Sequence, residues 1–121
     1  SFYIRARVTG EFNPTVSNPW QSVFAIKRNG TVVGAAPQPG SVPCGVHMPA
    51  ITYYADDANS TTENSFFDMW DSPATLSAVT YQLCIICSDN GTYYINRCVN
   101  ASTTGGYERG TSSITVMEIG A

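Results

Sequence analysis

The cysteines are the side chains of this sequence best suited to metal or redox chemistry, and two of them have the CxxC spacing. These two are Cys84 and Cys87, in the stretch Cys84-Ile85-Ile86-Cys87. The stretch is apolar and predicts a β-strand, in which residues three apart point to opposite faces. Such a pair cannot share a tetrahedral zinc ion or close a thioredoxin-type bridge, which needs a turn or a helix. We therefore expect no zinc site here.

Nucleophilic catalysis would depend on His47, which is the only histidine of the chain. A Ser–His–Asp or Cys–His arrangement needs an imidazole as its base. His47 lies in a proline-rich segment three residues after Cys44, and this spacing matches no known arrangement of a nucleophile and its base. We expect His47 to be a loop residue without a catalytic role.

Carboxylates between residues 56 and 71 could act in pairs in glycoside hydrolysis or could hold calcium. They are Asp56, Asp57, Glu63, Asp68 and Asp71. Adjacent aspartates in a loop normally face water, and the D-x-D-x-D-G pattern of a calcium loop is absent from the sequence. We expect no catalytic residues, no metal and no cofactor.

The aromatic residues of the predicted loops favour sugar recognition. A ring packs on the C–H face of a sugar, while Asp, Asn, Glu or Arg side chains bond the sugar hydroxyls. The candidate ligand-binding residues are Trp20, Tyr53, Tyr54, Asp56, Asp57, Tyr107 and Glu108. Each of them could equally contact another subunit.

β-Strands must position these residues, because no helical period in the sequence lasts longer than one turn. Residues 3–8 alternate between apolar and polar side chains, as in a strand with two unlike faces. Asn29-Gly30 predicts a type I′ hairpin, and Asp89-Asn90-Gly91 predicts a second hairpin. The expected strands are 3–8, 23–28, 31–34, 51–54, 65–70, 79–88, 92–99 and 114–119. The pattern predicts an all-β fold, an antiparallel β-sandwich of the jelly-roll kind, in a single domain over residues 1–121.

Composition excludes some partners. Charged residues make up 12% of the 121 residues, about half of the usual roughly 25%. The net charge is −3, with only six Lys and Arg, which argues against nucleic acid because phosphates need a basic patch. No apolar run approaches the ~20 residues of a membrane-spanning helix, so we expect no membrane insertion.

The predicted last strand is unusual because both of its faces are apolar. Ile114 and Val116 point to one side, and Met117 and Ile119 point to the other, with Glu118 as the exception. The outer face of a lone sandwich is normally polar. Such a strand is either central and covered or lies at a subunit interface.

The chain from Asp71 onward contains D-S-P-A-T-x-S-A-V-T-Y-x-L, then G-T-Y-Y-I-N-R, then Y-x-R-G-T-S-S-I-T-V-M-E-I, and an earlier segment reads F-A-I-K-R-N-G-T-V-V-G. These motifs resemble the C-terminal domain of bacteriophage tail fibres and related trimeric fibre-tip proteins. The likeness is weakest in the loops from Ala35 to Asn64. It implies a β-sandwich that forms a parallel homotrimer at the end of a fibre and has no enzyme activity. Together with the doubly apolar last strand, it makes Ile114, Val116, Met117 and Ile119 candidates for the trimer interface.

The same resemblance bears on the thiols, since a phage protein folds in a reducing cytosol. We expect free cysteines, with Cys84–Cys98 as the one bridge to test. A three-residue loop centred on Gly91 would set these two opposite each other, whereas a two-residue loop would pair Cys84 with Arg97.

We expect the receptor-binding tip of a trimeric tail fibre or surface fibre, on the virion or outside the cell. Its loops would recognise a glycan or a protein on the target cell, and three weak sites would gain avidity. The chain opens with the strand-like Ser1-Phe2-Tyr3-Ile4 and no Met, so we expect a fragment of a longer fibre protein. The alternatives are a purely structural cap that keeps the fibre trimeric, and a glycan hydrolase carried by the fibre.

Overall fold

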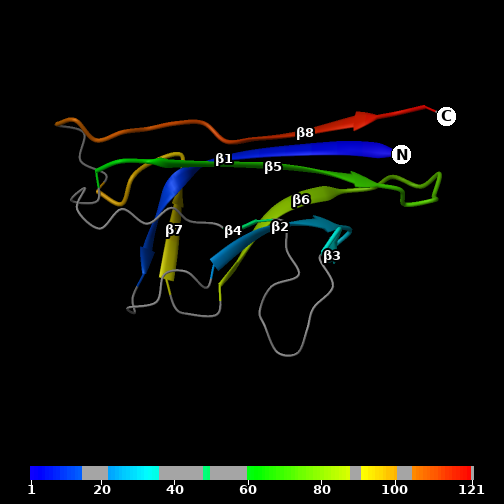
Figure 1. Cartoon of the computed structure of the whole chain (residues 1–121), viewed down its shortest axis with the longest axis horizontal. Helices are drawn as coiled ribbons and strands as arrows, with labels where there is room; N and C mark the ends of the chain where they lie inside the picture. The colour runs from blue at the N-terminus through cyan, green and yellow to red at the C-terminus, as the bar shows by residue number, and fades with distance from the viewer. Residues whose placement is uncertain (15–21, 36–47, 50–59, 88–90, 101–104, 121) are drawn as a thin grey trace.

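The secondary-structure elements of the described part of the protein are all β-strands, joined by turns and loops. The structure is a computed structural model that describes residues 1–14, 22–35, 48–49, 60–87, 91–100 and 105–120. These residues contain no helix, and therefore none long and apolar enough to cross a membrane. They form two antiparallel sheets with a shared apolar core, which is consistent with the predicted β-sandwich (Figure 1).

The first sheet is organised around one long strand. It consists of β1 (Phe2–Pro14), β5 (Glu63–Asp71), β7 (Gly91–Ile95) and β8 (Ser113–Glu118). One edge of β1 pairs with β5 along Phe2–Gly10. The other edge pairs first with β8, along Phe2–Arg7, and then with β7, along Gly10–Pro14. In Figure 1, β8, β1 and β5 run side by side, and β1 turns away from them to meet β7.

The second sheet is organised around β2. It consists of β2 (Ser22–Arg28), β3 (Thr31–Val33), β4 (Met48–Pro49) and β6 (Tyr81–Cys87). The predicted Asn29-Gly30 hairpin joins β2 to β3 and is confirmed, with a positive φ of 48° at Asn29 and 86° at Gly30. Both central residues of a type I′ turn require this conformation.

The hairpin that we predicted around Asp89-Asn90-Gly91 is wrong. β6 pairs with β2 over its full length, Tyr81–Cys87, and belongs to the second sheet. β7 pairs with β1 and belongs to the first sheet. An Asn-Gly pair favours a hairpin only locally, and here each strand finds a longer-range partner instead. The chain therefore crosses between the two sheets from β6 to β7.

The core lies between the inner faces of β1, β5 and β2. Its buried members are Ile4, Ala6, Val8, Phe24, Ile26, Phe67 and Met69. They alternate with exposed residues along β1 and β5, as the two-residue period of a strand requires. Across the core, the ring of Phe24 stacks on Phe67 at 6.5 Å and meets Tyr93 edge-on at 5.4 Å.

Gly10 stands where β1 passes from its pairing with β8 to its pairing with β7. A Cβ atom at this position would overlap the carbonyl oxygen of Tyr94 and lie 2.7 Å from Cε1 of Tyr93. Only a residue without a side chain lets β7 approach β1 this closely. Gly10 thus allows one strand to serve two neighbours on the same edge.

Candidate functional site

The last strand, β8, is the most exposed element with apolar side chains. It pairs with β1 and with no other strand among the described residues, and all six of its residues are exposed. Ile114, Val116, Met117 and Ile119 are each exposed by 40% to 45%. Of the two alternatives left by the sequence, the central and covered strand is therefore excluded for the described chain. Among the described residues, β8 is an edge strand with exposed side chains on both faces.

The register of β8 against β1 confirms the two apolar faces. Val116 lies opposite Ile4, a core residue, so its side chain is on the inner side of the sheet. Met117 lies opposite Tyr3 and points to the outer side. The predicted division of these residues between two faces was therefore correct.

On the inner side of β8 lies a hollow that we call the β8 groove. Its volume is about 530 Å³, within the range of roughly 300–1,000 Å³ that is typical of binding pockets. Its apolar lining consists of Phe2, Leu76, Ala78, Val79, Tyr81, Ile114 and Val116. Leu76 is fully exposed, and it belongs to the connection from β5 to β6. The core does not extend over this part of the sheet, so apolar groups stay open to water.

On the outer side of the same sheet lies a second apolar surface, which we call the aromatic face. Its members are Tyr3, Phe66, Trp70, Met117 and Ile119. Tyr3 pairs with Trp70 on one side and Met117 on the other, which forms a ladder across three strands. The rings of Tyr3 and Trp70 are 5.3 Å apart and tilted by 54°. Phe66 is 70% exposed and Trp70 is 62% exposed, whereas the outer face of a monomeric sandwich is normally polar.

Charged side chains of both signs stand within the aromatic face. Arg5 on β1 lies opposite Asp68 on β5, between the aromatic ladder and Phe66. Tyr3 donates a hydrogen bond from its hydroxyl to Oδ2 of Asp68 at 2.7 Å, and this bond raises the pKa of Tyr3. The face therefore combines rings with polar groups held at fixed positions.

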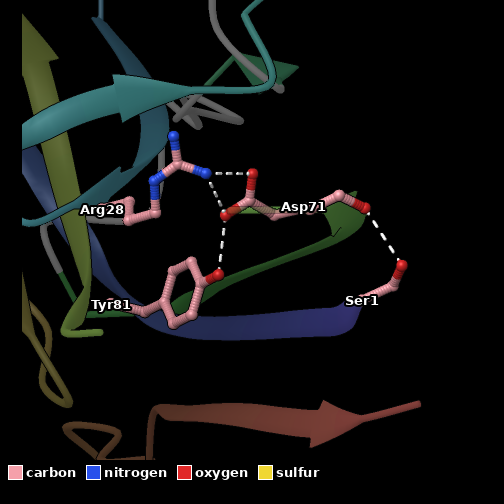
Figure 2. Close-up of polar contacts among 5 residues, drawn as sticks. Ser1, Arg28, Asp71 and Tyr81 are labelled. Carbon is pink, nitrogen blue, oxygen red and sulfur yellow. Dashed lines mark hydrogen bonds and ion pairs between the residues drawn. The ribbon is translucent and has the colours of Figure 1, made fainter. Parts of the chain in front are cut away.

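An ion pair joins the two sheets beside the β8 groove. Nη1 of Arg28 donates to both carboxylate oxygens of Asp71, at 2.7 and 2.8 Å, and Tyr81 donates to Oδ2 of Asp71 at 2.6 Å (Figure 2). Burial, with help from the bond to Asp71, raises the pKa of Tyr81 to about 12. Because Tyr81 lines the groove, these contacts hold one of its walls in place.

Two of the predicted ligand-binding residues lie in the described chain. Glu108 accepts hydrogen bonds at Oε2 from the amide and the hydroxyl of Thr62, at 3.1 and 3.4 Å. Its own amide donates to the carbonyl of Ser60 at 3.3 Å. Glu108 thus ties the loop after residue 105 to the start of β5. Tyr107 is half-buried beside Gly105.

The other predicted ligand-binding residues, Trp20, Tyr53, Tyr54, Asp56 and Asp57, lie outside the described residues. The same is true of His47 and Cys44. The role of these residues stays a prediction.

Cys84 and Cys98 are free thiols. Cys84 donates to the carbonyl of Ala25 at 3.3 Å, and the buried Cys98 donates to the carbonyl of Asn100 at 3.0 Å. No bridge joins Cys84 to Cys98. Cys84 lies on β6 of the second sheet, whereas Cys98 follows β7 of the first sheet. Burial raises the pKa of Cys84, which disfavours the reactive thiolate.

No metal-binding group of three or more His, Cys, Asp or Glu side chains occurs within the described ranges. Asp71, one of the carboxylates considered for hydrolysis, is paired with Arg28. Asp68 accepts the hydrogen bond of Tyr3.

Sequence reasoning missed the aromatic face. Along Ser65-Phe66-Phe67-Asp68-Met69-Trp70, either set of alternate residues contains an aromatic ring, so the pattern alone does not tell which set faces the core. The structure places Phe67 and Met69 inside and Phe66 and Trp70 outside. The charged Asp68 between the two outer rings was the available signal.

The chain matches no protein-family model, no curated protein and no solved structure in the three comparisons made.

Proposed function

We propose that this chain is the tip domain of a homotrimeric fibre and attaches that fibre to a ligand on a cell surface. The observation that carries the proposal is the exposure of β8, all six of whose residues are exposed and whose apolar side chains point to both faces. The motifs that resemble trimeric fibre tips include this same strand, and the number of copies rests on that resemblance.

The exposed apolar groups favour self-association on energetic grounds. Burial of apolar surface contributes about 25 cal/mol per Å². Contiguous exposed apolar patches on a soluble protein normally mark contact surfaces. The β8 groove and the aromatic face both expose large apolar side chains, although polar groups stand among them, and β8 contributes to each.

Attachment would be the work of the loops. The candidate residues Trp20, Tyr53, Tyr54, Asp56, Asp57 and Tyr107 combine rings with hydrogen-bonding groups, a composition that suits a cell-surface glycan or protein. The remaining candidate, Glu108, is bonded to Thr62. The proposed location is a virion or an extracellular surface fibre, and the mechanism is multivalent adhesion without catalysis or a cofactor.

The test is the mass of the parent chain in solution, measured by light scattering at micromolar concentration, followed by binding of the labelled protein to intact target cells. We expect three copies per particle and saturable binding. A monodisperse monomer would remove the basis of the proposal. A trimer that binds neither cells nor any member of a glycan array would favour the purely structural cap.

A further inference from the structure

We infer that the subunits join head to tail, with the aromatic face of one copy packed into the β8 groove of the next copy. The inference rests on the proposed self-assembly and adds to it the identity of the two contact surfaces. It names the second copy of this chain as the occupant of the groove.

The first argument is that one chain carries two different apolar surfaces. Val116 belongs to the groove and Met117 to the aromatic face, and these neighbours point to opposite sides of β8. A two-fold contact would bury the same surface on both copies and leave the other surface exposed. A head-to-tail contact buries both at once, and contacts of this kind close into rings when the rotation allows it.

The second argument is that one surface is hollow and the other presents exposed rings. The groove is a hollow of about 530 Å³ whose apolar walls include Leu76, Ile114 and Val116. The aromatic face presents Phe66 and Trp70, two large rings that stand 70% and 62% out in solvent. Aromatic side chains that enter an apolar pocket of the partner are the usual centre of a protein interface.

The third argument is charge. Glu118 is the one ionisable carboxylate on β8, and it lines the groove. The aromatic face holds two positive groups, Arg5 and Arg7, against one carboxylate, Asp68, which lies opposite Arg5. The groove of one copy therefore offers a negative group to the positive groups of the next, which favours this orientation over a like-to-like contact.

The test uses two variants of the parent chain. The groove variant is Val116→Asp, and the face variant is Phe66→Asp combined with Trp70→Thr. The control is Ile95→Asp, which also places a carboxylate at an exposed apolar position, 58% exposed, but on β7. Analytical ultracentrifugation at micromolar concentration gives the state of each protein and of a 1:1 mixture of the two variants.

We expect the control to stay trimeric and each variant alone to be monomeric. The mixture should form a 1:1 heterodimer and nothing larger. In the mixture, the intact aromatic face of the groove variant can pack into the intact groove of the face variant. The remaining groove and the remaining face both carry substitutions, so they cannot bind a third copy or close a ring.

Other outcomes would overturn the inference. If either variant alone formed dimers, the contacts would be like-to-like. If the face variant stayed trimeric but lost cell binding, the aromatic face would be a ligand surface. A parent chain that is monomeric from the start would instead contradict the proposed function. If circular dichroism showed a variant to be unfolded, Ile114→Thr with Val116→Thr and Trp70→Thr alone would replace the pair, since Thr retains strand propensity.

Discussion

At the scale of single residues, Asp71 is the group on which the junction of the two sheets depends. Its carboxylate is 11% exposed and accepts bonds from Arg28 and Tyr81. Because one nitrogen of Arg28 spans both oxygens, a lysine can supply part of this contact. The arrangement differs from the two-nitrogen fork that only arginine provides.

We expect Arg28→Met to lower the free energy of unfolding by about 1–3 kcal/mol, because it leaves a mostly buried carboxylate with Tyr81 as its remaining donor. Arg28→Lys should lose less than half as much. Chemical denaturation of both variants beside the parent gives the two differences. Equal losses would show that the charge of Arg28 contributes little.

Two tyrosines should make the fold less stable at alkaline pH. Burial raises the pKa of Tyr93 to about 12 from an ordinary 10, and burial with the bond to Asp71 does the same for Tyr81. A raised pKa means that the folded state holds the proton more tightly. The stabilisation is therefore complete below pH 10 and is lost as the pH rises from 10 to 12.

We expect denaturation experiments to show a falling free energy of unfolding over this range of pH. Tyr93→Phe should remove part of the fall while changing the stability at pH 8 much less. A slope above pH 10 that is identical in parent and variant would mean that Tyr93 titrates normally.

The ligand residues of the loops are also a question at this scale. We expect Tyr54→Ala, Trp20→Ala and Tyr107→Ala to weaken cell binding at least several-fold, since the loss of a stacking ring costs on the order of 1–3 kcal/mol. Binding is measured on variants whose trimeric state has been verified. Parent-like binding by all three would move the receptor site elsewhere and strengthen the structural-cap alternative.

At the scale of elements, Gly10 decides whether β1 can serve both β8 and β7. We expect Gly10→Ala to destabilise the fold by roughly 1–3 kcal/mol, the usual cost of overpacking, because the new methyl group would overlap the backbone of Tyr94. Gly106→Ala is the matched control, since a Cβ there meets nothing within 4 Å. Thermal unfolding of both variants measures the contrast, and equal melting temperatures would contradict it.

The sequence predicted the strands with local signals and missed the features that depend on distant pairing. The alternation in β1, the Asn29-Gly30 turn and the two faces of β8 follow from side-chain period and turn chemistry, and all three are confirmed. The placement of β6 in the other sheet from β7 was not predictable in this way. It depends on which strands offer the longest pairing, and this information is spread over the whole chain.

The candidate site likewise has one part that local sequence predicts and another part that depends on distant pairing. The apolar groups of β8 could be named from the sequence because they sit on one strand. The β8 groove and the aromatic face could not be named from the sequence, since each combines β8 and β1 with a third segment. The groove adds Leu76 from the connection after β5, and the aromatic face adds Trp70 from β5.

At the scale of the whole molecule, assembly and adhesion should be linked. We expect Met117→Asp to break the trimer, because it places a charge in the ladder with Tyr3 and Trp70. Cell binding of this variant should fall by a factor of ~10² or more, the contribution of avidity. Fusion of a trimeric coiled coil to the N-terminus is the control and should restore binding. A monomer that binds as well as the parent would separate adhesion from assembly.

The first and last strands bring Ser1 and Ile119 together, and this has a mechanical consequence. The amide of Ile119 donates to the carbonyl of Ser1 at 2.8 Å, and Figure 1 shows both ends on the same side of the molecule. From Phe2 to Arg7, β1 is hydrogen-bonded on one edge to β5 and on the other to β8. Tension applied through Ser1 along the strand, and resisted at the opposite end of the sheet, would load both rows of bonds in shear, all at once, instead of peeling them apart in sequence. The rate of forced unfolding would then be set by the rupture of this three-strand clamp, so a pull on the N-terminus acts on the best-paired part of the sheet.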